Sequence, residues 1–541
     1  MKKQLFLGVS SLLCVVLASC GVRESKNNEG EGSHIGELSD TKTNITIGTY
    51  DGGVKAKWLE NAKPIFEDLY KDTVFEEGKK GVNLVIDCNI AYNGNAMLSN
   101  PIDQLTKDIY FTESINYKAL VNDNKCLDIT DVFETTCEGE SKKIEDKLPA
   151  ELKENLKING KYYGVPFWDG FYGFVYDKTL FEEEKLYLDA TGMGLTNNFK
   201  TNHSYGPNGV DDGGTLDDGL PATYDEFHNW CLKIKNKGIT PFVYSSQFYN
   251  YVDRSLVNFW SDYEGKNNFY LNYSFNGTAT NLVNIGVDPT DPNNIMAPVT
   301  ITESNGYMLQ RQAGKYNALD FLVTNMNEQF ATGIGTHTEA QQCFVDNANA
   351  QRKYAMLIDG SWWENEAKNI IESTKSSTGI RHDFAFMPIP KATENKVGEK
   401  TTVISNCDAY GFIKKGCGNE TACKALMKFL HSDAQLKAFT KETSITRAFN
   451  TEWTEAELNE LTSYGKSLIN LKQTADIVYP LSNASIVTKN PSTFNYTTYP
   501  WQNGSSTSPF NYMKTNPGAT AKGYFDSLYT YYKNAWDRLN K

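Results

Sequence analysis

The sequence lacks the features that mark several common classes of protein. Only six of its 541 residues are histidines, and they are scattered without the spacing of a metal site. It contains no G-x-S-x-G elbow, no H-E-x-x-H motif and no phosphate-binding loop. The formal net charge is −13, so the chain is poorly suited to neutralising a row of phosphates. Neither a familiar catalytic motif nor a nucleic-acid partner is therefore expected.

Apolar runs of membrane-spanning length are also missing. The run at residues 5–17 follows Lys2 and Lys3 and has the length of a signal-peptide apolar region. The next residues, Leu17-Ala18-Ser19-Cys20, resemble the bacterial lipobox, which implies cleavage before Cys20 and a lipid on its thiol. The alternative is an ordinary secretory signal that happens to contain a cysteine. We expect a lipoprotein signal over 1–20, a membrane anchor at Cys20 and a soluble remainder.

Cysteines with C-x-x-C spacing are absent, which argues against a zinc ribbon. Eight cysteines follow Cys20, and two pairs, Cys126–Cys137 and Cys417–Cys423, are close enough in sequence to form disulfides outside the cytoplasm. The alternative is that these cysteines are buried free thiols that pack as small apolar side chains. The spacing does not choose between the two.

After the signal, the pattern changes from a polar linker to alternating strands and helices. Residues 21–43 are rich in glycine, serine, glutamate and asparagine, which predicts a flexible tether. Strand patterns follow at 44–53, 82–94 and 107–114, and apolar residues at helical spacing lie between the first two. Strand–helix–strand repetition predicts an α/β lobe with a largely parallel sheet.

Ligands of such lobes meet the loops beyond the carboxyl ends of the strands. The three strand-end loops carry polar and aromatic candidates for ligand contact, namely Tyr50, Asp51, Asn93 and Glu113. A solvated loop or a core position is the alternative for each of them.

The second half repeats the order of strand, glycine turn and helix. Thr223 is the expected N-cap of a helix that starts after Pro221 and ends at Gly238. AMLIDGSWWENEAKNII (355–371) reads as a strand, a tight turn and a helix, and FAFMPIP (384–390) reads as a further strand.

Six motifs, in order, resemble the extracellular solute-binding proteins of carbohydrate ABC transporters, the maltose-binding-protein-like family. They are GKYYGVPFWDGFYGFVYDKTLFEE (160–183), PATYDEF (221–227), GITPF (238–242), AMLIDGSWW (355–363), FAFMPIP (384–390) and AYGFIKK with its following helix (409–439). The resemblance implies a two-lobed periplasmic-binding-protein-like α/β fold of type II, with a hinge and a ligand cleft between the lobes. By that pattern, 44–128 and 384–441 form lobe 1, and 129–383 and 442–541 form lobe 2.

An unusually aromatic segment suggests how a sugar would be held. Eight of the fifteen residues from Tyr162 to Tyr176 are aromatic. A sugar ring presents apolar C–H faces and a rim of hydroxyls, so flat rings and a few carboxylates or amides suit it. The resemblance places the residues after the proline of PFWDG (166–170) in the cleft, which maps onto Phe167, Trp168, Asp169 and Tyr172. The alternative is that these rings pack the core of the second lobe.

Further candidates come from the resemblance alone. The tryptophan after the Gly-Ser turn stacks on the sugar in the family, and this maps onto Trp362, with Trp363 as an unusual second tryptophan of which one is expected to face the core. Trp260 lies where many members place a cleft aromatic. Asn406 and Asp408 are further candidates for ligand contact, in a loop that departs from the more usual glycine-rich turn of the family.

A glycine-rich acidic insertion, SYGPNGVDDGGTLDDGLP (204–221), offers carboxylates to a calcium ion through Asp211, Asp212, Asp217 and Asp218. The spacing fails the EF-hand pattern, because position twelve counted from Asp211 is Ala222 rather than glutamate. A solvated turn before the Pro221 helix is the alternative. No other cofactor is expected.

These observations together predict a non-catalytic, monomeric, lipid-anchored receptor. It would capture a carbohydrate between two lobes outside the cytoplasm and deliver it to the permease subunits of an ABC importer. The alternatives are a surface glycan-binding lipoprotein without a transport role, and a receptor for a peptide or another solute. A glycosidase would need two opposed carboxylates, which the sequence alone does not exclude.

Overall fold

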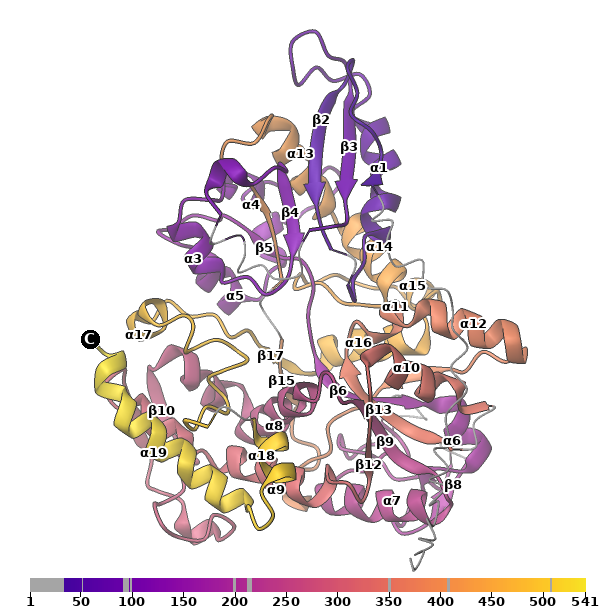
Figure 1. The fold of residues 1–541 in the computed structure, drawn as a ribbon, viewed down its shortest axis with the longest axis vertical. Coiled ribbons are helices and arrows are strands. Elements are labelled where there is room, and N and C mark those ends of the chain that lie inside the picture. Colours follow the sequence, from indigo (N-terminus) through magenta and orange to yellow (C-terminus); the bar gives the residue numbers. More distant parts are fainter. Residues whose placement is uncertain are drawn as a thin grey trace, which may run out of the picture. The chain divides into compact units, whose positions relative to one another are not determined.

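The first of two large sheets is built mainly from the N-terminal part of the chain. In the computed structural model, residues 34–50, 52–90, 97, 100–197, 201–211, 217–348, 352–405, 409–505 and 508–541 are described. The strand order is β1-β3-β2-β4-β16-β5. Figure 1 labels β2, β3, β4 and β5 of this sheet. The bounds are β1 His34–Ile35, β2 Thr43–Gly48, β3 Val82–Asp87, β4 Ile109–Thr112, β5 Val165–Pro166 and β16 Tyr410–Ile413.

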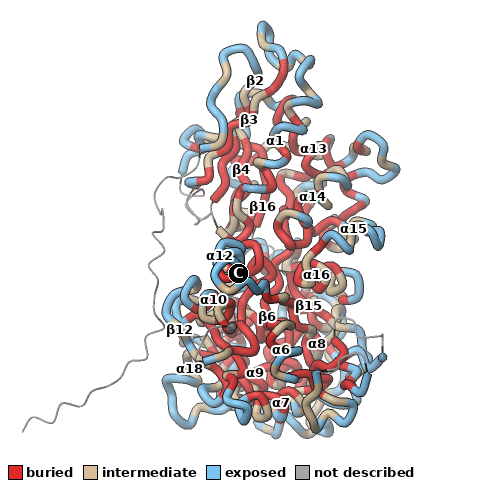
Figure 2. Tube along the Cα trace, turned by 90° about the vertical axis from the view of Figure 1, so that its right-hand side faces the viewer, coloured by how far each residue is buried: buried red, intermediate tan, exposed pale blue. Residues whose placement is uncertain are grey.

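Parallel and antiparallel pairs coexist in this first sheet. Strand β2 runs parallel to β3 and β4, as the strand–helix–strand pattern predicts, whereas β16 runs antiparallel to β4 and β5. Helices α1 (Lys57–Leu69), α13 (Glu420–Leu430) and α14 (Asp433–Thr443) pack together, and α1 and α13 contact β3 and β2. Strand β4 is buried along its length, β2 and β3 alternate between buried and half-buried positions, and the outer loops are exposed (Figure 2).

The second sheet has the order β12-β9-β13-β6-β14. Strands β9, β12 and β13 are parallel, and β6 runs antiparallel to both β13 and β14. Every residue of β6 and β13 is buried, so these strands read as continuous rather than alternating apolar runs. The bounds are β6 Tyr172–Asp177, β9 Thr240–Ser245, β12 Ala331–Ile334, β13 Tyr354–Gly360 and β14 Phe384–Phe386.

Two short strands pair in a different sheet from the one that the expected lobe boundaries imply. Strand β14 was expected to open the return into lobe 1, but it pairs with β6 in the second sheet. Strand β5 precedes β6 in the chain by only a few residues, yet it pairs with β16 in the first sheet. The chain therefore leaves the first sheet at Pro166 and enters the second at Tyr172, so residues 167–171 form a crossing between the sheets.

A helical layer with its own small core lies beside the second sheet. This layer contains α8 (Asn250–Ser274), α9 (Ala313–Asn325) and α19 (Ala521–Leu539). Helix α9 packs against both α8 and α19. A separate cluster of buried apolar side chains joins the end of α8 to α19 and includes Phe275, Phe494 and Trp536. The C-terminal residues are thereby folded against the middle of the chain.

Further α-helices, and strands that pair with one another outside the two large sheets, make up much of the rest of the described chain. The remaining helices are α3 Tyr117–Asn122, α4 Thr130–Phe133, α5 Ala150–Leu156, α6 Lys178–Glu184, α7 Tyr224–Asn236, α10 His337–Val345, α11 Trp363–Glu366, α12 Lys368–Thr378, α15 Glu455–Asn459, α16 Ser463–Thr474, α17 Ser485–Lys489 and α18 Pro509–Thr515. The remaining strands are β7 Tyr187–Leu188, β8 Leu195–Thr196, β10 Gly277–Ala279, β11 Val299–Ile301, β15 Thr402–Ile404 and β17 Asp476–Val478.

Local sequence signals explain where α7 begins and ends. The Thr223 side chain accepts a hydrogen bond from the amide of Glu226 at 3.2 Å, as expected for an N-cap. The Glu226 carboxylate binds the Ala222 amide at 2.7 Å rather than the amide of the cap itself. Gly238 has φ +79°, a conformation that favours glycine, and the helix ends just before it.

The cysteine pairs that were candidates for disulfides are free thiols. Cys126, Cys137, Cys417 and Cys423 are all buried and unbridged. They pack as small apolar side chains, which is the second of the two alternatives that the spacing allowed.

Helices α8 and α9 approach each other closely around Gly314. A Cβ at this position would lie 2.8 Å from the Trp260 carbonyl oxygen, so only glycine fits without displacement. The Gly314 amide donates to the Glu264 carboxylate at 2.7 Å. Burial raises the pKa of Glu264 to about 7, although this hydrogen bond and those from Asn281 and Asn268 oppose the shift.

The raised pKa of Glu264 predicts a pH-dependent stability that Glu264→Gln removes. The folded state holds the proton up to about pH 7, whereas the unfolded chain loses it near its ordinary value of 4.5. The free energy of unfolding therefore falls as pH rises through this window, by on the order of 3 kcal/mol from this group. Denaturant titrations between pH 4.5 and 7.5 should show a shallower decline for Glu264→Gln. The exposed control Glu77→Gln should keep the wild-type slope, and equal slopes for all three proteins would contradict the prediction.

Candidate ligand-binding site

The aromatic segment that stood out in the sequence contributes to a cluster of rings at the junction of the two sheets. Trp168 and Trp362 meet edge to face, with ring centroids 5.4 Å apart. Tyr172 lies edge-on to Trp362 at 4.9 Å, and Tyr251 lies edge-on to Trp362 at 5.7 Å. Tyr496, from the C-terminal part of the chain, stacks on Tyr172 at 6.0 Å. These five residues, referred to as the aromatic cluster, come from four separate stretches of sequence.

Hydrogen bonds of the Gly-Ser turn fix the position of Trp362. The Ser361 amide donates to the Phe171 carbonyl oxygen at 2.8 Å, and the Ser361 hydroxyl donates to the Asp169 carbonyl oxygen at 3.0 Å. A Cβ at Gly360 would lie 2.1 Å from the Trp362 ring, so glycine is required for the indole to fold back over the turn. The turn at the end of β13 and the crossing at 167–171 thus form one rigid support for the cluster.

A cation lies against the rings of the cluster. The Arg254 guanidinium stands 5.2 Å from the centre of the Tyr172 ring and 5.9 Å from that of Tyr251, within the range of cation–π attraction. It also donates to the Tyr172 hydroxyl. Arg254 lies in the first turns of α8, so this helix positions the cation at the edge of the cluster.

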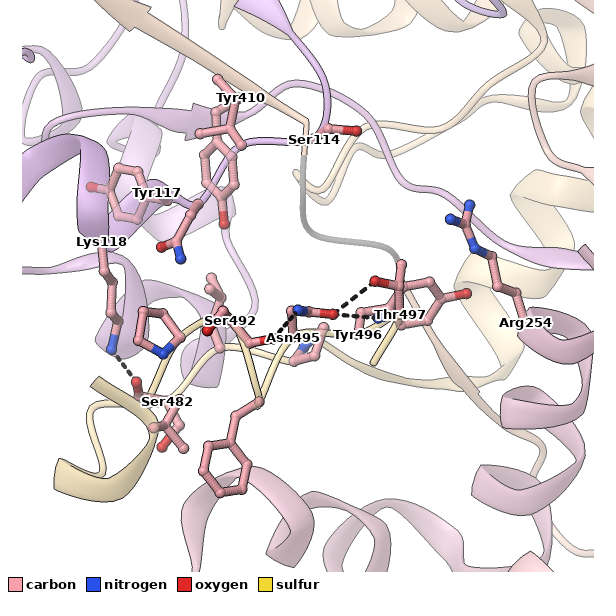
Figure 3. A pocket seen from close by; sticks show the side chains of 17 residues that line it. Ser114, Tyr117, Lys118, Arg254, Tyr410, Ser482, Ser492, Asn495, Tyr496 and Thr497 are labelled. Carbon is pink, nitrogen blue, oxygen red and sulfur yellow. Dashed lines mark hydrogen bonds between the residues drawn. The ribbon is translucent and has the colours of Figure 1, made fainter. Parts of the chain in front are cut away.

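Next to the aromatic cluster is a cavity of about 530 Å³, referred to as the main cavity. Figure 3 shows it between Tyr117 and Tyr410 on one side and the chain from Ser492 to Thr497 on the other. Tyr117 and Tyr410 stack at 4.8 Å with nearly parallel planes. The lining residues are Ser114, Ile115, Asn116, Tyr117, Lys118, Arg254, Tyr410, Pro480, Leu481, Ser482, Val487, Pro491, Ser492, Phe494, Asn495, Tyr496 and Thr497.

The main cavity lies beyond the carboxyl end of strand β4. Ser114 and Ile115 follow β4 directly, and Tyr410 begins the antiparallel neighbour β16. This is the edge of an α/β sheet where ligands bind. The volume falls within the roughly 300–1,000 Å³ of small-molecule sites, and the wall combines aromatic faces with amide and hydroxyl groups.

Direct contacts join the loop after β2 to helix α11 beside the aromatic cluster. The Asn365 amide donates to the carbonyl oxygens of Gly53 and Val54 at 2.8 and 2.9 Å. Lys55 donates to the Glu366 carbonyl oxygen at 3.2 Å. A Cβ at Gly53 would lie 2.5 Å from the Trp362 ring, so the loop backbone rests against the indole. Elements of both sheets are thus held together at this point.

Comparison with known proteins identifies the family. Residues 104–437 match the family described as bacterial extracellular solute-binding protein. The chain belongs to this family. Members are non-catalytic receptors, so the absence of catalytic motifs noted in the sequence agrees with the family assignment. No curated protein matches the sequence.

Solved structures of the same fold extend over nearly the whole chain. The apo form of RafE from Streptococcus pneumoniae aligns with a TM-score of 0.54 at 13% identity, covering 94% of this chain and 100% of that one. A cyclic α-maltosyl-1,6-maltose binding protein from Arthrobacter globiformis aligns at 0.53 and 12% identity, covering 92% and 100%. The GacH receptor of Streptomyces glaucescens aligns at 0.52 and 14% identity, covering 93% and 99%. At these identities the likeness shows the fold, and it confirms the expected periplasmic-binding-protein-like architecture.

The other ring candidates from the sequence occupy different environments. Phe167 is buried against Trp58 and Phe111 beside the first sheet. Trp363 is fully buried and packs on Phe384 and Tyr464, and its neighbour Trp362 is 6% exposed and belongs to the same apolar core.

Trp260 is fully buried within the helical layer, away from the main cavity. Its ring contacts Phe269 at 4.7 Å, its Nε1 donates to Gln312, and the Lys315 ammonium stands 4.0 Å from the ring centre. Glu113, in contrast, directly precedes the cavity residue Ser114. Tyr50 is buried and forms an isolated bridge with Asn89.

Asp169 lies under the aromatic cluster and is fully buried. Its Oδ1 accepts hydrogen bonds from Ser405 and Tyr479, each at 3.1 Å. Its Oδ2 accepts from Thr446 at 3.3 Å and forms an ion pair with Lys472 at 2.8 Å. Both carboxylate oxygens are therefore engaged by protein groups from three other segments of the chain.

Several predicted residues fall outside the described part of the chain. These are Cys20, Asp51, Asn93, Asp212, Asn406 and Asp408.

The aspartates of the acidic insertion lie in two different environments. His203, Asp211 and Asp218 bring possible ligand atoms within 4.8 Å of one another, whereas Asp217 accepts hydrogen bonds from the backbone and side chain of Asn208. An imidazole nitrogen in the set is unlike the all-oxygen shell that calcium takes, so the arrangement gives little support to the calcium prediction.

The sequence reading missed the C-terminal wall of the main cavity. Residues from Pro480 to Thr497 line it, together with Arg254 from α8 and Tyr410 from β16. The signal that could have pointed to the C-terminal wall is FNYTTYPW (494–501), which mixes rings with amides and hydroxyls much as PFWDG does. Only the fold brings it next to the residues of the first half.

Asp169→Ala should destabilise the fold strongly, because it leaves the Lys472 ammonium, whose side chain is only 10% exposed, without its counter-ion. Removing one partner of a buried pair costs roughly 3–5 kcal/mol of unfolding free energy, measurable by chemical denaturation. The matched control Asp68→Ala breaks an exposed Asp–Lys contact with Lys71 and should cost less than about 1 kcal/mol. If Asp169→Ala keeps wild-type stability and loses only ligand binding, the carboxylate is a ligand contact, as the sequence suggested, rather than a structural tie.

Proposed function

We propose that this solute-binding protein captures a carbohydrate and delivers it to the membrane permease of an ABC importer, while a lipid on Cys20 holds it at the outer face of the membrane. The observation that carries the sugar assignment is the wall of the main cavity. Tyrosine rings suit the C–H faces of a sugar, and Asn116, Asn495 and Thr497 suit its hydroxyls. Structures with the same fold include RafE in complex with raffinose and a maltotriose-binding protein with maltotriose.

In this proposal the protein binds by closing, without breaking any bond. The contacts between the loop after β2 and α11, made by Asn365 and Lys55, are the kind that form when two parts of a receptor meet. A sugar that touches both sides would stabilise the closed form, because only that form makes all of its contacts. The candidate contacts from the sequence were Phe167, Trp168, Asp169, Tyr172, Trp362, Trp363, Tyr50, Glu113 and Trp260. None of them is among the described residues that line the main cavity. Trp168, Tyr172 and Trp362 are buried in the aromatic cluster, where Tyr172 contacts the lining residues Arg254 and Tyr496, and Glu113 precedes the lining residue Ser114.

A saccharide screen tests the assignment. The purified chain without residues 1–20 should show a raised Tm and altered tryptophan fluorescence with at least one member of a panel of mono- and oligosaccharides that includes raffinose, maltotriose and chitin oligosaccharides. At a hundredfold excess over Kd, binding adds about 2.7 kcal/mol to the stability of the folded state. A peptide library serves as the competing panel. If no sugar changes Tm or tryptophan fluorescence, or if only peptides do so, the carbohydrate assignment is wrong.

The adjacent tryptophans provide a matched pair for the same titration. Trp362→Ala should weaken sugar binding at least tenfold in a protein that still folds, because it removes a ring of the aromatic cluster. Trp363→Ala removes a core ring and should lower Tm by far more while leaving Kd of the folded fraction unchanged. If Trp362→Ala keeps the wild-type Kd and Trp363→Ala weakens binding, the ligand does not bind beside the aromatic cluster.

Cys20→Ser tests the anchor separately from the ligand. Without the thiol no diacylglycerol can be attached, so the protein should move from the membrane fraction to the medium or periplasm. Cell fractionation and metabolic labelling with palmitate measure this. Cys14→Ser, in the same apolar run, is the matched control and should stay membrane-bound and labelled. Release of the wild-type protein without any label would contradict lipidation.

A further inference from the structure

A second, smaller cavity lies next to the main cavity. It has a volume of about 180 Å³ and shares Arg254, Tyr496 and Thr497 with the main cavity. It is referred to as the outer cavity, and its remaining lining residues are Asn250, Asp253, Val257, Thr498, Trp501, Gln502, Ser505 and Ser508. It is formed entirely by the start of α8 and the C-terminal segment 496–508, without any residue of the first sheet.

A buried carboxylate faces this outer cavity. Asp253 is only 3% exposed. Its Oδ1 accepts the Phe510 amide at 2.8 Å. The Ser508 hydroxyl lines the same cavity and pairs with the Asp253 carboxyl group, which lowers the pKa of Asp253. A carboxyl group and a hydroxyl thus stand together at the cavity wall, where both can bind a polar group of a ligand.

Burial raises the pKa of Asp253 to about 7, against the opposing effects of Ser508, the Phe510 amide and Arg254. A second titratable group near it is Tyr524 of α19, whose pKa Asp253 helps to raise. A carboxyl group of this kind suits a neutral hydroxyl-bearing ligand, since a hydroxyl can both donate to it and accept from it.

The walls of the outer cavity have the same chemistry as those of the main cavity. Tyr496 and Trp501 contribute rings, and Gln502 and Thr498 contribute an amide and a hydroxyl. Its volume is below the roughly 300–1,000 Å³ of an independent small-molecule site. Because it shares three lining residues with the main cavity, it fits an extension of that cavity better than a separate site.

We propose that the outer cavity is a subsite for the terminal unit of an oligosaccharide whose other units occupy the main cavity, with Asp253 and Ser508 binding its hydroxyls. This inference rests on the proposed carbohydrate function and narrows it. The ligand is a chain of several sugar units rather than a monosaccharide, and the C-terminal segment selects its length.

Calorimetric titration of the full chain with two graded series tests this inference. The series are malto-oligosaccharides of two to five units, and melibiose, raffinose and stachyose. In the series that binds, affinity should increase up to the length that reaches the outer cavity and then level off. Asp253→Asn replaces the cavity-facing acceptor oxygen by a donor, and Gln502→Ala removes an amide from the wall. Each should lower affinity for the longer saccharides about fivefold to tenfold and leave the shortest binder unchanged.

Gln329→Ala, an exposed glutamine on the loop before β12, is the matched control and should match wild type at every length. The Tm of each variant without ligand separates folding from binding, and Gln502→Ala keeps the test valid if Asp253→Asn fails to fold. If sugars bind but affinity is independent of length and of both substitutions, the subsite is wrong and the carbohydrate function stands. If neither series nor the wider panel binds wild type, the carbohydrate function fails and the subsite falls with it.

Discussion

The ion pair between Asp169 and Lys472 is the contact on which the arrangement of the two sheets depends. Asp169 lies in the crossing at 167–171, and its partners come from Ser405, Thr446, Lys472 and Tyr479. Its own amide also donates to the Thr446 carbonyl oxygen at 2.8 Å. The Asp169 carboxylate therefore connects the crossing at 167–171 to three later segments of the chain, which contain Ser405, Thr446 and Lys472. In a low-dielectric interior such a network is rigid when complete and costly when broken.

The aromatic cluster is attached directly to the crossing that contains Asp169. Ser361 binds the backbone of Asp169 and Phe171, and so the turn that carries Trp362 is fastened to the same crossing that carries Trp168 and Tyr172. A receptor whose parts move against each other needs a fixed reference at the point where the movement is smallest. In the closure proposed above, side chains placed there keep their geometry while the loops around Gly53 and Asn365, which are in contact in this structure, come together or part. This explains why a carboxylate that chemistry alone would assign to a sugar is instead enclosed by protein groups.

The C-terminal part of the chain contributes walls of both cavities. Residues 480–508 contribute the lower wall of the main cavity and one side of the outer cavity, and they are held in place by a small core of their own around Phe494 and Trp536. This segment packs on α8 and α19 through Trp501, and its Tyr496 also stacks on Tyr172 of the second sheet. In the proposed function, a change at its cavity-lining residues alters the cavities and leaves the contacts of Asp169 intact.

The sequence by itself determined the α/β class, the order of most strands and helices, the N-cap of α7 and the family. These depend on local patterns such as apolar periodicity, capping residues and turn glycines, which act over a few residues. It also made Trp168 and Trp362 candidates for ligand contact, which stays a prediction, and their ring centroids lie 5.4 Å apart. Only the tertiary structure decided that β14 joins the second sheet, that Trp363 and Trp260 are core residues, and that Asp169 is enclosed while Arg254 and Tyr496 line a cavity. The reason is physical: burial and pairing arise from contacts between segments hundreds of residues apart, and no short-range pattern carries that information.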